Sequence, residues 1–235
     1  MKPTTIVCFV ALILSAISCT KESTTIQSSG ITVESSTSDD MTGINALSVK
    51  IGSQIWMNKN LNVTKYRNGD PIPEVRNKAK WATLTTGAWC WLNNDSANSI
   101  YGRLYNAYAV NDPRGLAPAG WHISSDSEWA TLTTFLGGEG VAGGKMKSTG
   151  TIEAGTGLWY APNLNATNIS GFTGLPGGYR NYTGTFYDIG YNGDWWSSES
   201  STSYAWYRSL TDGTGIIYRD SYYEQSGFSV RCVRD

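Results

Sequence analysis

The stretch GLAPAGWHISSDSEWATLTTFLGG, residues 115–138, contains the strongest helix signal in the chain. Ser125 and Glu128 have the spacing of a capping box, in which two side chains satisfy free backbone N–H groups at the start of a helix. Apolar side chains follow at helical spacing, before Gly137 and Gly138 end the pattern. We therefore predict a helix between Ser125 and Gly137. Its apolar face consists of Trp129, Leu132, Phe135 and Leu136.

His122, the only histidine of the chain, lies just before this helix. Acid–base chemistry near neutral pH most often uses histidine, which makes His122 the first residue to consider for catalysis. Its place between Trp121 and the capped helix is also that of a structural residue leading into the helix. We favour the structural interpretation.

Most other segments are short and are separated by turns of Gly, Asn and Asp, a pattern typical of strands. Residues 103–110 are a candidate for a second helix. We therefore predict an α+β domain with short antiparallel strands, one or two helices and long irregular loops. The predicted strands are QIWMNKNLNV (54–63), GFTGLPGGYR (171–180), GTFYDIG (184–190), YAWYRSL (204–210), GIIYRDSYY (215–223) and FSVRCV (228–233).

Two segments have the composition of a phosphate-binding loop and of a calcium-binding loop, respectively, but lack the residues that such loops have at fixed positions. GGEGVAGGKM, residues 137–146, has Glu139 where a phosphate-binding loop has its first glycine and Met146 where it has Ser or Thr, so we interpret it as a flexible loop. NNDSAN, residues 93–98, lacks the alternating acids and distal glutamate of an EF-hand, so we interpret it as turns.

The first twenty residues, MKPTTIVCFVALILSAISCT, predict export. A cationic start precedes an apolar run that is too short for a membrane span of about 20 residues, as in a secretory signal peptide. Small residues directly before Cys19 are similar to a bacterial lipoprotein box, which predicts a signal peptide over residues 1–18 and a lipid on Cys19. Ordinary secretion by cleavage after Ala16-Ile17-Ser18 is the alternative.

Residues 19–48 are rich in Ser and Thr and contain no aromatic residue, so we expect the lipidated cysteine to be followed by a disordered tether. Residues 49–235 contain every aromatic residue except Phe9 and form one predicted domain. The chain has 18 Lys and Arg against 19 Asp and Glu, with no basic cluster. This balance argues against nucleic acid as a partner.

An ordered set of blocks resembles the Fibrobacter succinogenes major paralogous domain over nearly all of residues 49–235. The resemblance implies a C-type-lectin-like fold, akin to sulfatase-modifying-factor domains, with short twisted strands, in a cell-envelope protein. It implies no biochemical activity. The blocks are IGSQIWMNKNLNV, YRNGDPIPEV, YGRLYNAYAVNDPRGLAPAGWHISSDSEWATL, GGKMKSTGT, SGFTGLPGGYR, GTFYDIGYNGDWWSSES and GFSVRCVRD.

Related folds include enzymes that hold copper on a cysteine pair or iron on several histidines. This domain offers only Cys90, Cys232 and His122, whereas such metal sites need three or four convergent soft ligands. The sugar-binding calcium motifs of true C-type lectins, Glu-Pro-Asn and Gln-Pro-Asp, are also absent. We therefore predict no metal, no cofactor and no catalytic residue. A Cys–His pair is the remaining catalytic alternative.

Ten Trp and fourteen Tyr are more than a core of this size needs. Tyr and Trp suit surfaces where an apolar face must also form hydrogen bonds. We assign Trp56, Trp121 and Trp129 to the core because of their place in strands or on the apolar helix face. The candidates for a ligand surface are Trp89, Trp91, Tyr191 and Trp196.

Cys90 and Cys232 are the only thiols of the predicted domain. An exported chain meets an oxidising environment, which predicts a disulfide between them. Two separate buried thiols are the alternative, because such thiols behave as small apolar residues and need no partner.

Together these features predict a lipid-anchored protein of the cell envelope, at the outer membrane, with exposure at the cell surface left open. We expect its lectin-like domain to bind an extracytoplasmic glycan or protein without catalysis. A structural subunit of a surface appendage or envelope assembly is the second interpretation, and an enzyme related to sulfatase-modifying factors is the third.

We predict that Cys19→Ser releases the protein from membranes. A bacterial lipoprotein carries at least two acyl chains on its cysteine, which is enough for stable attachment, and the variant carries none. The measurement is fractionation of cell envelopes followed by detection of the chain. A variant that still sediments with membranes would place the anchor elsewhere.

Overall fold

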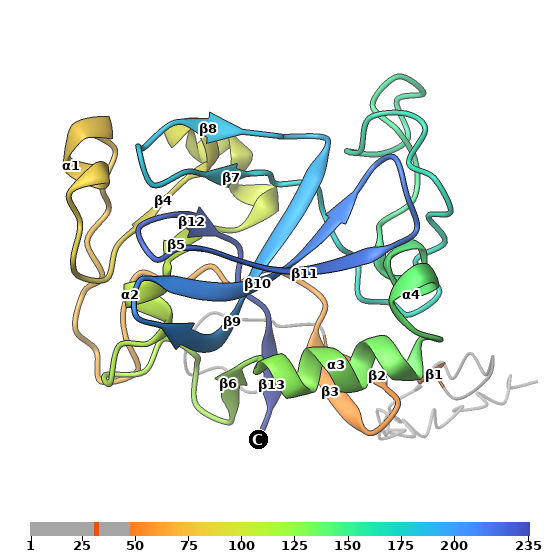
Figure 1. Ribbon diagram of the computed structural model, residues 1–235, viewed down its shortest axis with the longest axis horizontal. Helices are drawn as coiled ribbons and strands as arrows, with labels where there is room; N and C mark the ends of the chain where they lie inside the picture. Colours follow the sequence, from red (N-terminus) through yellow and green to blue (C-terminus); the bar gives the residue numbers. More distant parts are fainter. Residues whose placement is uncertain (1–30, 33–47) are drawn as a thin grey trace, which may run out of the picture.

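The computed structural model describes residues 31–32 and 48–235. The predicted signal peptide, Cys19 and all of the predicted tether except residues 31, 32 and 48 lie outside the described residues. The described chain is a mixed α+β structure with three antiparallel sheets and short helices, which confirms the predicted α+β class (Figure 1).

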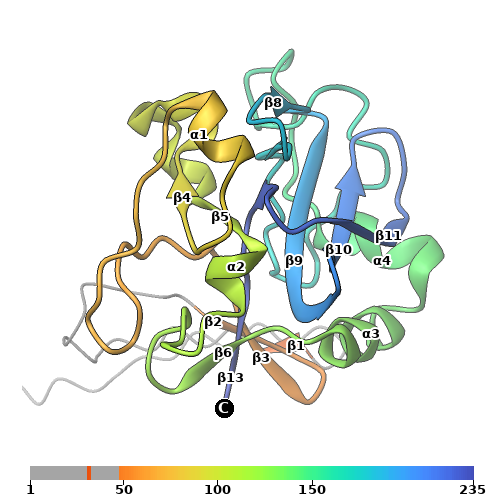
Figure 2. The same ribbon diagram turned by 60° about the vertical axis from the view of Figure 1, so that its left-hand side comes forward.

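The first sheet brings together segments from near both ends of the domain. Its strand order is β1-β2-β3-β13-β6, so the last strand lies between an early hairpin and the strand that contains His122. Figures 1 and 2 show this sheet at one end of the molecule, with the C-terminus beside it. Its strands are β1 (Ile31–Thr32), β2 (Ser48–Ile51), β3 (Gln54–Met57), β6 (Trp121–Ile123) and β13 (Cys232–Arg234).

The other two sheets lie above the first one in Figure 1. The second sheet has the order β4-β5-β12-β7-β8, and the third is the three-stranded β11-β10-β9. The predicted strands do not include β9, the longest strand. The strands are β4 (Trp89–Cys90), β5 (Leu104–Asn106), β7 (Tyr179–Arg180), β8 (Phe186–Tyr187), β9 (Asn192–Ser201), β10 (Tyr204–Thr211), β11 (Ile217–Tyr223) and β12 (Gly227–Phe228).

Helix α3 (Asp126–Phe135) confirms the central prediction from the sequence. The Ser125 hydroxyl accepts a hydrogen bond from the Glu128 backbone N–H, and the Glu128 carboxylate accepts one from the Ser125 N–H, which completes the capping box. In the segment predicted as a second helix, β5 precedes a single helical turn. The remaining helices are α1 (Lys78–Ala82), α2 (Ala107–Val110), η1 (Leu92–Asn94), η2 (Ser96–Tyr101) and α4 (Glu139–Met146).

Helix α4 corrects our interpretation of residues 137–146 as a flexible loop. Two of its three glycines are packing positions, because a Cβ at Gly143 would lie 2.3 Å from the backbone oxygen of Ile216. A Cβ at Gly144 would lie 2.5 Å from the backbone oxygen of Asn165. The glycine-rich composition therefore reflects close approach of two backbones to a helix.

Tryptophans fill the core between α3, the first sheet and the third sheet. The Trp56 ring lies 4.8 Å from that of Trp129, and Phe172 contacts both. Trp195, from β9, closes the cluster against Phe172 at 5.6 Å. Trp56 and Trp129 are completely buried, as predicted, whereas Trp121 is only half-buried.

Buried cations hold the loops to these sheets. Arg231 donates from Nη1 to the carbonyl oxygens of Met57 (2.9 Å) and Phe172 (2.5 Å), and from Nη2 to that of Thr173 (2.9 Å). Its Nε donates to Asn60 Oδ1 at 2.6 Å. Burial lowers the pKa of Arg231 to about 9, so the guanidinium remains charged at neutral pH.

Two more cations bind backbone oxygens in the same way. The Lys147 Nζ, in a completely buried residue, donates to the carbonyl oxygens of Leu164, Thr211 and Thr214 at 2.8–2.9 Å. Arg180 donates to Val75 O at 2.6 Å and stacks on Trp81. Because most of these partners are loop carbonyls, and Thr211 is the last residue of β10, the cations fix the loops where regular secondary structure ends.

The predicted disulfide between Cys90 and Cys232 is absent from the structure. Both are free, buried thiols. Cys90, in β4, packs in a cluster with Val75 and Trp81, whereas Cys232, in β13, belongs to a different cluster and a different sheet. Burial raises the pKa of each thiol to about 12, which disfavours the reactive thiolate.

We predict that Arg231→Leu lowers the free energy of unfolding by about 3 kcal/mol or more, because it leaves buried acceptors without donors. Urea unfolding followed by tryptophan fluorescence measures the change. Arg76→Leu is the matched control, since the Arg76 side chain is 61% exposed and pairs only with Glu74. Equal losses for the two variants would contradict a special role for Arg231.

Candidate functional site

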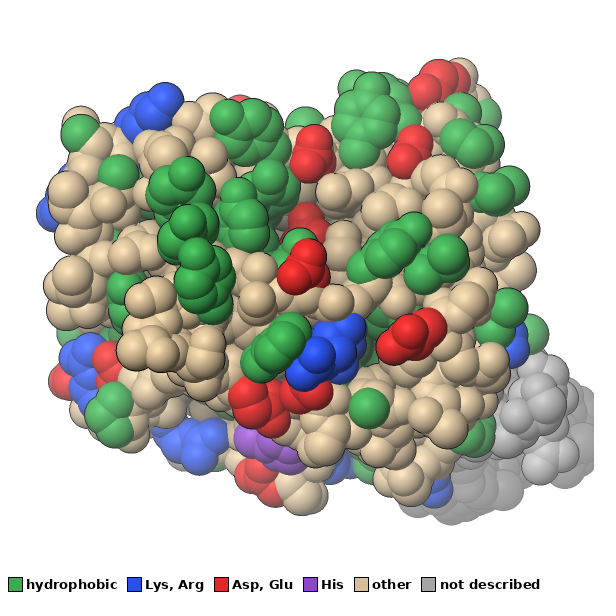
Figure 3. Space-filling view, viewed as in Figure 1, with side chains coloured by type: hydrophobic (Ala, Val, Ile, Leu, Met, Phe, Trp, Pro, Cys, Tyr) green, Lys and Arg blue, Asp and Glu red, His purple; other side chains and the backbone are tan. Residues whose placement is uncertain are grey.

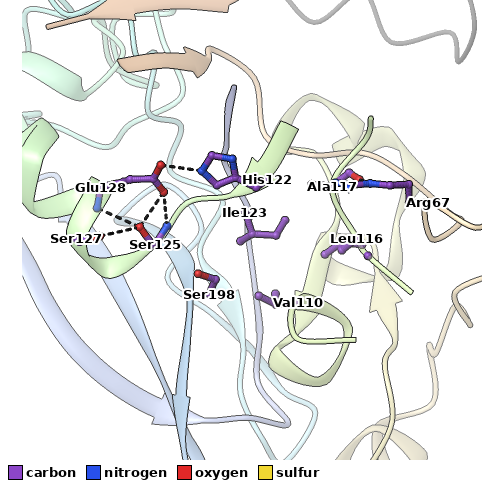
Figure 4. Close-up of a pocket in the computed structure, with 11 residues that line it drawn as sticks. Arg67, Val110, Leu116, Ala117, His122, Ile123, Ser125, Ser127, Glu128 and Ser198 are labelled. Carbon is purple, nitrogen blue, oxygen red and sulfur yellow. Dashed lines mark hydrogen bonds and ion pairs between the residues drawn. The ribbon is translucent and has the colours of Figure 1, made fainter. Parts of the chain in front are cut away.

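A cleft of about 450 Å³ lies where β6 meets the start of α3. Arg67 orders one wall, because its Nε donates to Ala117 O at 3.0 Å and its Nη2 donates to Trp121 O at 2.7 Å. Figure 4 shows an apolar side and a polar side. The cleft is lined by Arg67, Val110, Gly115, Leu116, Ala117, His122, Ile123, Ser125, Ser127, Glu128 and Ser198.

His122 lines this cleft and contacts the carboxylates of Glu128 and Asp235. Its Nε2 lies 2.7 Å from Glu128 Oε1, and its Nδ1 lies 2.8 Å from Asp235 Oδ1. The other Glu128 oxygen accepts hydrogen bonds from the N–H and the hydroxyl of Ser125, both at 2.8 Å. The cluster therefore joins β6, the cap of α3 and the C-terminal residue.

Charge in this cluster favours a protonated imidazole. Burial lowers the pKa of His122, but the hydrogen bonds to Glu128 and Asp235 outweigh it and raise the pKa above its ordinary value. For Glu128, burial raises the pKa, and the hydrogen bonds from Ser125 and His122 reverse the effect and lower it. Both imidazole nitrogens face carboxylate oxygens, so neither faces a hydroxyl or thiol among the described residues.

Trp89 and Trp91 lie together, as predicted for alternate residues of an extended segment. Their rings are 5.6 Å apart, and the Arg103 guanidinium lies 4.3 Å from Trp89 and 4.2 Å from Trp91. Trp89 is buried and Trp91 is half-buried. The aromatic faces of this pair are therefore already occupied by a cation of the same chain.

Tyr191 and Trp196 do not join that pair in one surface. Trp196 is completely buried, donates from Nε1 to Tyr105 O at 2.8 Å and stacks on Phe228. This burial corrects its assignment to a ligand surface. Tyr191 is 49% exposed and packs on Tyr160, with ring centroids 4.5 Å apart.

The structure instead assembles an aromatic surface from tyrosines that we had not selected. A continuous series of ring contacts, from 4.3 to 6.3 Å between centroids, links six of them. Three of the six are exposed, namely Tyr182 (39%), Tyr187 (45%) and Tyr204 (39%). We call this set the tyrosine surface: Tyr179, Tyr182, Tyr187, Tyr204, Tyr222 and Tyr223.

Strand register pairs four of the six tyrosines, and Tyr182 contacts both Tyr222 and Tyr223, which project from opposite faces of β11. Tyr204 lies directly opposite Tyr223 in the β10–β11 pair, and Tyr179 lies opposite Tyr187 in the β7–β8 pair, so cross-strand neighbours share a face. Phe228 supports the half-buried members from below, at 5.4 Å from Tyr179. Figure 3 shows hydrophobic side chains gathered over this part of the molecule.

The tyrosine content of YAWYRSL and GIIYRDSYY was visible in the sequence, but the pairing of these segments was not. A register shift of one residue would send every side chain of the shifted strand to the other face of the sheet. The signal that pointed toward this site was therefore the tyrosine content of two adjacent predicted strands.

The described residues contain neither a cluster of metal ligands nor a membrane-spanning helix. No group of three or more His, Cys, Asp or Glu in residues 31–32 and 48–235 is placed to hold a metal ion. No helix in this part of the chain is long and apolar enough to cross a membrane.

Comparison with protein families identifies one match. The family model described as the Fibrobacter succinogenes major domain matches residues 49–234. No curated protein and no solved structure matches the chain significantly.

We predict that His122→Gln reduces stability more at about pH 5.5 than at about pH 8.5. A histidine whose pKa is raised by folding stabilises the protein fully below its unfolded pKa of about 6.5, and this stabilisation is lost as the pH rises through the folded pKa. The side chain is 41% exposed, so we expect a difference below about 1 kcal/mol.

Urea unfolding of both proteins at the two pH values measures this difference. Subtracting the variant from the unaltered chain cancels other groups that titrate in the same range. A pH-independent difference would show that His122 contributes only by packing.

Proposed function

The chain belongs to the Fibrobacter succinogenes major domain family, and from this premise we propose that it is a cell-envelope lipoprotein whose domain is a non-catalytic module that binds an extracytoplasmic glycan. Family membership supplies no chemistry by itself. The observation that carries the proposal is the tyrosine surface.

Tyrosine suits a saccharide because each side chain offers a flat apolar ring and a hydroxyl group. Sugar rings present C–H groups on their faces and hydroxyls at their edges, so one tyrosine can stack and form a hydrogen bond. Contacts between the six rings limit their rotamers before a ligand arrives, which reduces the entropy lost on binding. A rigid, exposed aromatic patch is therefore better suited to recognition than isolated surface tyrosines are.

The His122 cleft supports a non-catalytic role. Carboxylates occupy both imidazole nitrogens, and the nearby Ser125 hydroxyl donates to Glu128. This order differs from that of a hydrolase, in which the histidine lies between the acid and the nucleophilic serine.

The C-type-lectin-like architecture and the anchor are parts of the same proposal. Buried tryptophans beneath long loops support the lectin-like arrangement, since Trp159 is completely buried and donates from Nε1 to Gly174 O. The sequence around Cys19 supports the lipid anchor and an outer-membrane location. A protein ligand, or a structural role in an envelope assembly, would use the same surface without saccharide binding.

We predict that Tyr182→Ala and Tyr223→Ala each weaken glycan binding by at least about tenfold, because each removes a ring from the stacking surface. The measurement begins with a glycan array probed with the full chain and continues by calorimetric titration of the best ligand. Tyr218→Ala is the matched control, since Tyr218 is 42% exposed on β11 and is not part of the tyrosine surface.

An empty array would argue against a glycan ligand. Equal weakening by Tyr218→Ala would argue against the tyrosine surface as the binding site. Pull-down of one envelope protein in fixed stoichiometry, with no glycan bound, would favour the structural alternative.

A further inference from the structure

Two apolar side chains are exposed where α3 turns into α4. Phe135, the last residue of α3, is 46% exposed, although the sequence places it on the apolar face of the helix, and Val141, in the first turn of α4, is 49% exposed. A Cβ at Gly137 would lie 3.1 Å from Val141 Cγ2, so Val141 folds back toward the end of α3. We call residues 135–141 the helix corner.

The tip of the helix corner is free of contacts with the rest of the described chain. A Cβ added at Gly138 or at Gly140 would point into open space. Glu139 is the only acid of the corner, and Lys145 lies beside it, because its Nζ donates to Leu136 O at 2.8 Å. Exposed apolar groups on a turn without neighbours are available to a partner outside the chain.

The chain enters the folded domain beside this corner. β1 pairs antiparallel with β2, and Ile31 lies directly opposite Ile51. The next residue of β2, Gly52, packs against Phe135, since a Cβ there would lie 2.9 Å from Phe135 Cδ2. Opposite residues of antiparallel strands are about 5 Å apart, and consecutive Cα atoms are about 3.8 Å apart. The chain therefore reaches the domain within about 10 Å of the glycine that Phe135 covers.

The anchor proposed above limits how far this entry point can lie from a membrane. Ile31 is twelve residues after Cys19, and twelve extended residues span at most about 43 Å. Ser48 is 29 residues after Cys19, and a chain that first met the domain there would span up to about 100 Å. The pairing of β1 with β2 therefore keeps the end of the domain that contains the helix corner close to the anchored lipid.

The opposite end of the domain contains part of the tyrosine surface. Figures 1 and 2 show β1, β2 and α3 at one end of the molecule and β7 and β8 at the other. Tyr179 and Tyr187 lie on β7 and β8. An orientation that turns the helix corner toward a membrane therefore turns these two tyrosines away from it.

A lipid surface fits the helix corner better than a second copy of the chain does. A stable protein interface takes about 800 Å² from each partner, and two partly exposed side chains among three glycines supply far less. A bilayer requires no complementary shape, and apolar side chains enter its interface according to the apolar area that they bury.

We infer that the helix corner is a membrane-contact site, at which Phe135 and Val141 insert into the surface of the bilayer that holds the lipid on Cys19. This inference rests on the anchor in the proposed function and adds a defined orientation of the domain. The corner is a second, weaker attachment that acts only where the lipid already holds the chain at the membrane.

The test places a fluorescent probe at the corner of the lipidated full chain. Val141→Cys is labelled with nitrobenzoxadiazole, because Cys90 and Cys232 are buried and Cys19 carries the lipid. The chain is reconstituted in vesicles of phosphatidylethanolamine and phosphatidylglycerol in equal amounts, with nitroxide quenchers at two depths. We expect the quenching to place the probe about 5–10 Å into the boundary between headgroups and acyl chains, the depth of interfacial apolar side chains.

Ile100→Cys with the same label is the matched control. Ile100 is 62% exposed and belongs to η2, which packs beside the second sheet, so we expect no quenching by the lipid nitroxides there. Phe135→Ser in the Val141→Cys background should reduce the quenching at position 141 without releasing the chain from the vesicles. Ile100→Ser in the same background should leave it unchanged.

Flotation with the vesicles tests the anchor, and quenching tests the corner, so the two can fail separately. A chain that floats while position 141 stays unquenched would overturn the inference and leave the proposed lipoprotein in place. Equal quenching at positions 141 and 100 would also overturn it, because the domain would then have no preferred orientation. A lipidated chain that does not float would overturn the anchor, and the inference with it.

Discussion

The contact between the Arg231 guanidinium and Asn60 is the interaction on which the rest of the domain depends. Asn60 Oδ1 accepts from Arg231 and from the Trp195 indole, while its Nδ2 donates to Tyr101 O and Ser229 Oγ. One amide therefore connects the residue before β13, the edge strand β9 and the last residue of η2. Because every partner is buried, the arrangement has no water to substitute for a lost bond, and the surrounding loops share one geometry.

The same principle explains how a domain with few helices presents a defined surface. Its loops are ordered by cations that bind carbonyl oxygens, as Lys147 does, and its short strands are ordered by pairing. Five of the six tyrosines of the tyrosine surface lie on paired strands of the second and third sheets, and Tyr182 lies in the turn between β7 and β8. Recognition chemistry is thus placed on the most regular part of the structure, which suits a site that must hold several rings in fixed relation.

The sequence predicted the features that depend on local rules, and it failed where distant segments meet. The capping box at Ser125 and Glu128 could be recognised because it depends on neighbours a few residues apart. Three of the four residues predicted for the apolar helix face are buried, Trp129, Leu132 and Leu136, whereas Phe135 is 46% exposed. The burial of Trp196 could not be predicted in this way, because Trp196 is covered by Phe228, which comes from another sheet. Cys90 and Cys232 illustrate the same limit, because composition counts thiols without locating them in separate clusters.

The position of β13 between β3 and β6 has a consequence for how the chain acquires its fold. The hydrogen bond from Arg231 to Asn60 joins residues 171 positions apart. The first sheet and the buried network around Asn60 therefore cannot form before β13 has been synthesised. Contacts of such long range form slowly, because loop closure precedes any gain from packing. During synthesis the early hairpin therefore has no completed sheet to join. For the export that we propose for this chain, the delay would keep the domain unfolded until β13 has been made.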